Sequence, residues 1–301
     1  MKPRRTVIPI TLDRRRFVQG VAASLWAAAA MPRPAQALDT QFGNTKSLFS
    51  VNIETITFGL ESFEERIRQV AALGFDAVEF WDYANKDIDA LADVCEEMGM
   101  IISQFVLRGF VNHPTLHENF RQNLEAAIPV AHRLGVSRLT VIPGTQRDDA
   151  SPEEQLEACI EGYRAVTAIC EEADITLMVK PLNRLIDHPT VLVSKSQEAA
   201  EIVRQVDHRY VRMVFDTYHQ QVTEGNLLRN IESYYRAAPL IEYFQIADNP
   251  GHHEPGTGEI NFRNVLQAIY EYGYRGYIGL EMLPRRTAQQ ALAAVVNADQ
   301  W

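Results

Sequence analysis

The sequence predicts a (β/α)8 barrel, or TIM barrel, in which eight parallel strands are each followed by a helix. Eight short runs rich in branched and aromatic residues recur along the chain at intervals of about 30 residues, the length of one strand-helix unit. Each run is followed by a stretch with helical spacing of apolar residues. A doubly wound open sheet is the alternative, and it is disfavoured because no G-x-G-x-x-G segment follows the first strand.

The predicted strands are, in chain order, LFSVNIETI (48–56), DAVEFW (76–81), IISQFVL (101–107), SRLTVIPG (137–144), TLMVKPLN (176–183), VRMVFDTYH (211–219), IEYFQIAD (241–248) and YIGLEML (277–283). Helices are predicted over 63–74 after the first strand and over 153–173 after the fourth. Ser151 supplies an N-cap for the second of these helices, with Glu154 at the third helical position. Residues 285–301 predict a final helix that caps the barrel or contacts a partner subunit.

The first 37 residues have the pattern of an export signal, with an amphipathic N-terminal helix as the alternative. The charged segment DRRRFVQG leads into an apolar run of about a dozen residues and then into PRPAQA. This run is shorter than the ~20 residues that span a membrane, so we predict cleavage after Ala37 and no stable membrane anchor. The paired arginines before Phe17 predict twin-arginine export and a periplasmic or exported protein. Residues 38–47 then form a short segment ahead of one barrel, 48–301.

The charge balance argues against nucleic acid as a partner. The chain has a net charge of −10, and residues 1–37 hold seven basic residues and one acidic residue, so removing them takes the charge to −16. A surface of this sign repels phosphate backbones, and we expect a small-molecule ligand instead. The three cysteines are an odd number and fall in predicted helices, which predicts buried thiols and not a disulfide framework. The sequence carries no signal for an oligomeric state.

Polar residues recur at the C-terminal ends of the predicted strands, where barrel enzymes place their active sites. Polar groups in apolar strands are costly to bury without partners, so their recurrence at one rim favours a site over separately satisfied core residues. The residues at these ends are Glu79, Trp81, Gln104, Lys180, Asn183, Asp216, His219, Gln245, Asp248 and Glu281.

Asp216, Gln245 and Glu281, with His219 nearby, form an oxygen-rich set with little sulfur. Such a set suits Mg²⁺ or Mn²⁺ better than structural zinc. A cation of this kind polarises carbonyl and hydroxyl oxygens while a carboxylate moves a proton through an enediolate. We predict catalytic roles for Glu281, Lys180 and His219, with the role of Lys180 open among the interpretations given below.

Two loops and one strand end offer candidates for substrate binding. The loop DNPGHHEPGTGEINF, after the seventh strand, carries His252, His253 and Glu254 on a glycine-rich turn above the predicted barrel mouth. Arg108, after the third strand, either grips a substrate carboxylate with its fork of donors or pairs with a surface acid. The predicted substrate-binding residues are Asn183, His253, Glu254 and Arg108.

Four segments, FQIADNPGHHEPGTGEINF, FDTYHQQVTEGNL, KPLNR and GYIGLEMLP, resemble the hydroxypyruvate isomerase family of xylose isomerase-like TIM barrels. The resemblance covers most of residues 48–285 and is strongest from the fifth strand onward. It implies metal-assisted proton transfer between small hydroxy-carbonyl acids, such as hydroxypyruvate and tartronate semialdehyde. It also implies that Asp216, Gln245 and Glu281 are metal ligands and that Glu281 is one of two catalytic glutamates.

The fifth strand departs from the family pattern E-P-[ILV]-N, because Lys180 stands where the other glutamate is expected. In a first interpretation the ammonium replaces the cation and leaves a metal-free site, since unit charges ~4 Å apart interact by about 4 kcal/mol at an effective dielectric of 20. In a second, Lys180 is a general base or a Schiff-base nucleophile. In a third the site is inactive and only binds a sugar or hydroxy acid. A cation held by the other ligands, with the lysine turned aside, is a fourth.

The function predicted from these observations is isomerisation of a small hydroxy-carbonyl acid or sugar through an enediolate, with an altered catalytic position. The alternatives are an epimerase or lyase acting on oxidised sugars through Lys180, and a binding protein without catalysis. DNA repair endonucleases of related architecture are disfavoured, because they need a histidine-rich zinc cluster and a basic face, and neither is visible in the sequence.

Overall fold

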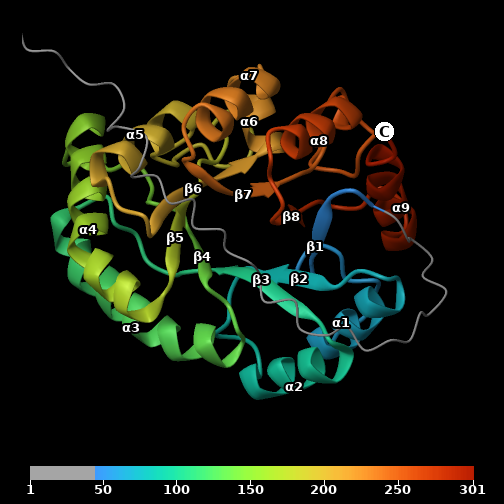
Figure 1. Ribbon diagram of the computed structural model, residues 1–301. Helices are drawn as coiled ribbons and strands as arrows, with labels where there is room; N and C mark the ends of the chain where they lie inside the picture. Colours follow the sequence, from blue (N-terminus) through green and yellow to red (C-terminus); the bar gives the residue numbers. More distant parts are fainter. Residues whose placement is uncertain (1–44) are drawn as a thin grey trace, which may run out of the picture. The chain divides into compact units, whose positions relative to one another are not determined.

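The computed structural model describes residues 45–301, and the predicted export signal of residues 1–37 lies outside them. Eight parallel strands close into a barrel in sequence order, with β8 paired to β1. Helices surround the strands on the outside (Figure 1). The predicted (β/α)8 barrel is therefore confirmed, and the closed ladder excludes the open-sheet alternative.

All eight predicted strands are present. They are β1 Leu48–Asn52, β2 Ala77–Phe80, β3 Ile101–Val106, β4 Arg138–Val141, β5 Thr176–Val179, β6 Val211–Asp216, β7 Ile241–Gln245 and β8 Tyr277–Leu280. The α-helices are α1 Phe63–Ala72, α2 Ile88–Met98, α3 His117–Arg133, α4 Pro152–Ala173, α5 Ser196–Val206, α6 Thr217–Thr223, α7 Leu227–Ile231, α8 Phe262–Glu271 and α9 Ala288–Ala298. A short 3₁₀ turn, Pro114–Leu116, precedes α3, and a π-helical turn, Glu232–Arg236, follows α7.

The interior of the barrel changes from apolar to polar along the strands. Side chains alternate between the two faces of a strand, so every second residue points into the barrel. A small buried cluster inside the barrel consists of Met178, Val214 and Tyr243. Two residues further along the same strands lie Lys180, Asp216 and Gln245, all of them buried. The barrel therefore has an apolar layer beneath a polar layer at the C-terminal ends of its strands.

The side chain of Asp216 ends β6 and starts α6. Its Oδ1 accepts hydrogen bonds from the backbone N–H groups of Tyr218 (3.0 Å) and His219 (3.3 Å), which are unpaired donors at the start of the helix. The sequence predicted a strand through His219, and the cap is the reason that it ends at Asp216. The same contact places His219 in the first turn of α6, beside the barrel mouth.

The ends of the described chain are joined through Asp299, which follows α9. Its carboxylate accepts hydrogen bonds from the backbone N–H of Ser47 (2.9 Å) and from the Ser47 hydroxyl (2.8 Å), just before β1. The predicted C-terminal helix is therefore present and is tied to the first strand. Earlier in the chain, Ser151 and Glu154 form the predicted capping box of α4.

Two further features of residues 45–301 are the state of the cysteines and the apolarity of the helices. All three cysteines are free and buried, as predicted. No helix in this part of the chain combines the length and the apolarity that a membrane span requires.

Gly279 on β8 leaves room for a carboxylate in the middle of the barrel. A Cβ built at Gly279 would lie 2.5 Å from Oε2 of Glu79 and 2.8 Å from its Cδ. We expect Gly279→Ala to destabilise the protein by about 1–3 kcal/mol, the usual cost of overpacking, in urea unfolding. If Glu79 is the cause, the cost falls in a Glu79→Ala background, and a cost that is unchanged there would contradict this origin.

Candidate active site

Lys180 lies at the centre of the polar layer, between two carboxylates. Its Nζ is 3.1 Å from Oε2 of Glu281, at the end of β8, and 3.2 Å from Oδ2 of Asp216, at the end of β6. The lysine residue is only 4% exposed. Pro181 follows it and favours extended backbone there, and the Lys180 N–H continues the ladder to Val141 O at 2.9 Å. The ammonium therefore stands among the residues predicted to bind a cation.

Glu79 is a second centre of the polar layer, fully buried at the end of β2. Its Oε2 accepts hydrogen bonds from the Tyr243 hydroxyl (2.7 Å) and Gln104 Nε2 (3.2 Å). Its Oε1 accepts from Gln245 Nε2 (2.9 Å) and Asn52 Nδ2 (3.2 Å). Four neutral donors thus converge on one carboxylate.

Gln245 joins the two centres, because its Nε2 also donates to Oε2 of Glu281 at 2.6 Å. With Lys180, this contact occupies Oε2 of Glu281. Within residues 45–301, no hydrogen bond to Oε1 of Glu281 is found, so this oxygen is open to a further partner.

Lys180 stays protonated in this surrounding. Burial by itself favours the neutral amine, but the charges of Glu281 and Asp216 and the hydrogen bond to Glu281 outweigh it. Together they raise the pKa of Lys180 above its ordinary value of 10.5. A protonated lysine has no lone pair with which to act as a base or attack a carbonyl carbon.

The environment of Glu79 favours the neutral form of its side chain, whereas that of Lys180 favours the charged form. Burial, and then the charge of Glu281, raise the pKa of Glu79 from 4.5 to about 7, although hydrogen bonds from Tyr243, Gln245 and Asn52 work against the rise. Between these two pH values the folded protein binds more protons at Glu79 than the unfolded chain does. The free energy of unfolding therefore falls as the pH rises through this range.

Glu79→Gln is expected to remove this pH dependence. A shift from 4.5 to about 7 corresponds to about 3 kcal/mol of stability that is present below pH 4.5 and lost as the pH rises past 7. Urea unfolding of both proteins across this range measures the difference between their slopes. Equal slopes would show that Glu79 titrates at an ordinary pKa in the folded protein.

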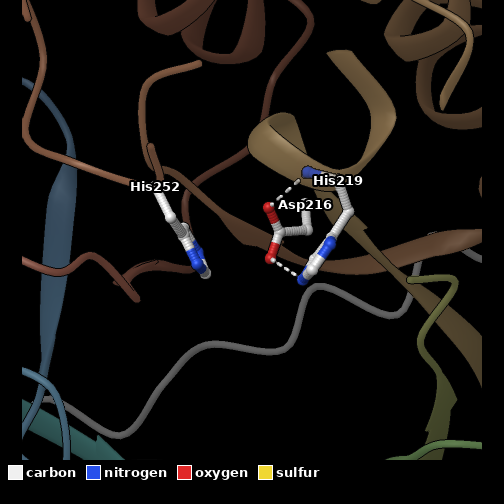
Figure 2. Close-up of side chains that lie close together, drawn as sticks. All are labelled: Asp216, His219 and His252. Atoms are coloured by element: carbon white, nitrogen blue, oxygen red, sulfur yellow. Dashed lines mark hydrogen bonds and ion pairs between the residues drawn. The ribbon is translucent and has the colours of Figure 1, made fainter. Parts of the chain in front are cut away.

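Two imidazoles flank Asp216 at the mouth of the barrel. Asp216, His219 and His252 point toward one another (Figure 2), and one ligand atom from each lies within 4.8 Å of the others, so the three could form a metal-binding triad. His219 Nε2 is 3.9 Å from Asp216 Oδ2. Burial, and then the positive charge of Lys180, hold the pKa of His219 well below its ordinary value. His219 is therefore a neutral imidazole.

The residues present do not fit a divalent cation at the predicted carboxylate site. The ammonium of Lys180 lies 3.1–3.2 Å from Asp216 and Glu281, where the cation would have to bind the same two oxygens. Two unit positive charges ~4 Å apart repel by about 4 kcal/mol at an effective dielectric of 20, so an ammonium on these two oxygens disfavours a second cation there. The third predicted ligand, Gln245, turns its NH₂ group toward Glu79 and Glu281, while its buried Oε1 has no hydrogen-bond partner among the described residues.

The structure also locates the other predicted site residues. Asn183 donates its side-chain N–H to His219 Nδ1 at 2.8 Å, beside the polar layer. His253 contacts the backbone instead, with its Nδ1 2.7 Å from the carbonyl oxygen of Leu283. Buried Glu254 accepts a hydrogen bond from the backbone N–H of Arg285 at 2.8 Å. Arg108 is exposed and paired with Asp82. The substrate contacts assigned to these four residues stay predictions.

Sequence reasoning missed part of the site. The Tyr243 hydroxyl donates a hydrogen bond to Glu79 inside the barrel. Tyr243 lies two residues before Gln245 on the same strand, so alternation along the strand could have predicted that both side chains face the barrel interior. Asp187 accepts hydrogen bonds from Asn183 and Tyr218, but nothing in the segment NRLIDHP marks it in advance. Asp248 was one of the predicted strand-end candidates. Its carboxylate instead accepts hydrogen bonds from backbone N–H groups of the β7–α8 loop, such as those of Gly256 and Gly258.

Sequence relatives match this chain over nearly their whole length. The hydroxypyruvate isomerase of Escherichia coli K12 is 30% identical over 253 residues, which cover 81% of this chain and 96% of that protein. The 2-oxo-tetronate isomerase of Haemophilus influenzae is 27% identical over 249 residues, covering 79% of this chain and 93% of that protein.

Solved structures match the fold as well. A Brucella melitensis protein described as an AP endonuclease of family 2 superposes with a TM-score of 0.77 at 28% identity, covering 82% of this chain and 97% of that one. The 3-keto-D-glucoside 4-epimerase of E. coli, at a TM-score of 0.70 and 18% identity, covers 84% of this chain and 100% of its own, and shows the fold alone. The model of the xylose isomerase-like TIM barrel family matches residues 67–298, so the chain belongs to the xylose isomerase-like TIM barrel family.

Proposed function

We propose that this protein isomerises a small hydroxy-carbonyl acid or sugar through an enediolate, in a site where Lys180 takes the place of a divalent cation. Relatives named as hydroxypyruvate isomerase and 2-oxo-tetronate isomerase support the reaction class. The observation that carries the proposal is the position of the Lys180 ammonium, 3.1 Å from Glu281 and 3.2 Å from Asp216.

The net charge of the site supports the replacement of a divalent cation by Lys180. In the family pattern, a glutamate at this position and a divalent cation together contribute +1, and a protonated lysine alone also contributes +1. The substrate oxygens therefore meet a similar net charge in both arrangements. The raised pKa of Lys180 argues against its use as a general base or Schiff-base nucleophile.

In the proposed reaction, Oε1 of Glu281 removes the proton from the carbon next to the carbonyl group and returns it to the former carbonyl carbon. The electron pair of the broken C–H bond forms the enediolate, whose oxygens are stabilised by the Lys180 ammonium and by the Nε2–H of His219. The hydroxyl proton moves between the two substrate oxygens, so that atoms and charge balance.

A second candidate is epimerisation of a keto sugar. It uses the same enediolate but returns the proton to the opposite face of the same carbon. The shared fold of the 3-keto-D-glucoside 4-epimerase favours it as the alternative. DNA is the less favoured substrate although the Brucella structure is described as an AP endonuclease, because the net charge of −10 repels a phosphate backbone.

We also propose that the protein is exported through its N-terminal signal. Sequencing the N-terminus of the mature protein would test this proposal.

The test measures proton exchange with and without metal. Chelator-treated wild type is incubated in D₂O with hydroxypyruvate, a 2-oxo-tetronate and keto sugars, and NMR follows deuterium entering the substrate carbon and the product formed. Mass spectrometry measures bound metal in wild type, Lys180→Glu and the exposed control Lys195→Glu. We expect metal-independent exchange in wild type and in the control, and a stoichiometric divalent ion only in Lys180→Glu.

Each other outcome is decisive. Exchange that disappears with chelator, or a full equivalent of metal in wild type, would overturn the metal-free site. No exchange with any of these substrates, combined with ligand binding in calorimetry, would leave a binding protein and reject the isomerase. Deuterium entry with inversion and no carbonyl shift would establish the epimerase.

A further inference from the structure

Asp187, in the loop between β5 and α5, holds two side chains of the site at once. Its Oδ2 accepts hydrogen bonds from Asn183 Nδ2 at 2.6 Å and from the Tyr218 hydroxyl at 2.7 Å. Asn183 in turn contacts the His219 ring, and the Tyr218 ring stacks on His252 with 4.1 Å between centroids. One carboxylate thus supports both imidazoles that flank Asp216.

The orientation of the Asn183 amide is set by its backbone neighbours. Its Oδ1 accepts hydrogen bonds from the N–H groups of Ile186 (3.1 Å) and Asp187 (3.0 Å), so this atom must be the oxygen. The NH₂ group then faces both Asp187 Oδ2 and His219 Nδ1. The backbone N–H of Asn183 also points at His219 Nδ1, at 3.2 Å.

His219 Nδ1 therefore faces donors only. A protonated Nδ1 would oppose two N–H groups, whereas an unprotonated Nδ1 accepts from them. In a neutral imidazole the proton must then be on Nε2, the nitrogen that faces Asp216.

We propose that Asn183 and Asp187 are positioning residues that lock His219 in its Nε2–H tautomer, so that His219 donates a hydrogen bond to a substrate oxygen and does not ligate a metal. A histidine that binds a metal through Nε2 normally donates its Nδ1–H to an acceptor, and here that position holds donors. The use of the Nε2–H toward a substrate rests on the proposed function, but the tautomer does not.

The tautomer is measurable without any activity. In protein labelled with ¹⁵N-histidine, long-range ¹H–¹⁵N correlation spectra distinguish a protonated from an unprotonated ring nitrogen, and the signals lost in His219→Gln assign the residue. We expect an unprotonated Nδ1 and a protonated Nε2 in wild type, unchanged by added Zn²⁺. A protonated Nδ1, or loss of the Nε2 proton on adding Zn²⁺, would overturn the inference.

A charge-conserving swap tests the two positioning residues. In Asn183→Asp/Asp187→Asn, a carboxylate faces His219 Nδ1 and the new amide can donate to it, so the proton is expected to move to Nδ1. An unchanged spectrum in the folded swap variant would contradict the role of the pair. Asn123→Asp, in an exposed asparagine pair on α3, is the matched control and should leave His219 unchanged. If the swap variant fails to fold, the wild-type spectrum still decides the tautomer.

Discussion

Replacement of Lys180 by methionine is expected to lower the free energy of unfolding by about 3–5 kcal/mol, the usual cost of removing one partner from a buried ion pair. Methionine keeps most of the volume of the lysine stem but removes the charge that faces Asp216 and Glu281. These two carboxylates, with Glu79 nearby, would then be buried without a cation. Urea unfolding at pH 7 without metal measures the loss.

The matched control is Lys195→Met at the start of α5, where the lysine is exposed and a change below about 0.5 kcal/mol is expected. The loss at Lys180 should shrink at low pH, because protonated carboxyl groups no longer need a cation. A loss below 1 kcal/mol at pH 7 would mean that the ammonium does not compensate the carboxylates. A loss reversed by Mn²⁺ would mean that a cation can take its place.

Glu281→Gln is expected to slow deuterium exchange into the substrate by about 10²–10⁴-fold, the range that general acid–base catalysis contributes. The amide cannot carry the proton, while it keeps the size of the side chain and one oxygen for Lys180. Initial rates from NMR at saturating substrate give the ratio. This prediction rests on the free Oε1 of Glu281 at the mouth of the barrel.

The exposed Glu232→Gln serves as the control and should exchange at the wild-type rate. The buried Glu79 is the competing candidate for the proton carrier, since its pKa of about 7 suits proton transfer near neutrality. If Glu79→Gln abolishes exchange while Glu281→Gln retains it, the proton passes through Glu79, and the assigned role of Glu281 is wrong.

The strand predictions were correct in number and order but too long at the C-terminal ends. β5 was predicted through Asn183 and ends at Val179, before Pro181, which has no N–H to continue a ladder. β6 ends three residues earlier than predicted, because the side chain of Asp216 caps α6. Periodicity cannot detect the ending of β6, since it depends on one side chain bonding to the backbone.

The sequence by itself determined the barrel and the rim where its polar residues gather. Alternation along a strand and the repeat of the strand-helix unit are local properties, so they placed Lys180, Asp216, Gln245 and Glu281 on one layer before any distance was known. Only the tertiary structure decided that the ammonium lies between two carboxylates, that Glu79 joins them through Gln245, and that Asp187 supports both imidazoles. These contacts connect strands and loops far apart in the chain, and closure of the barrel and side-chain packing set their distances.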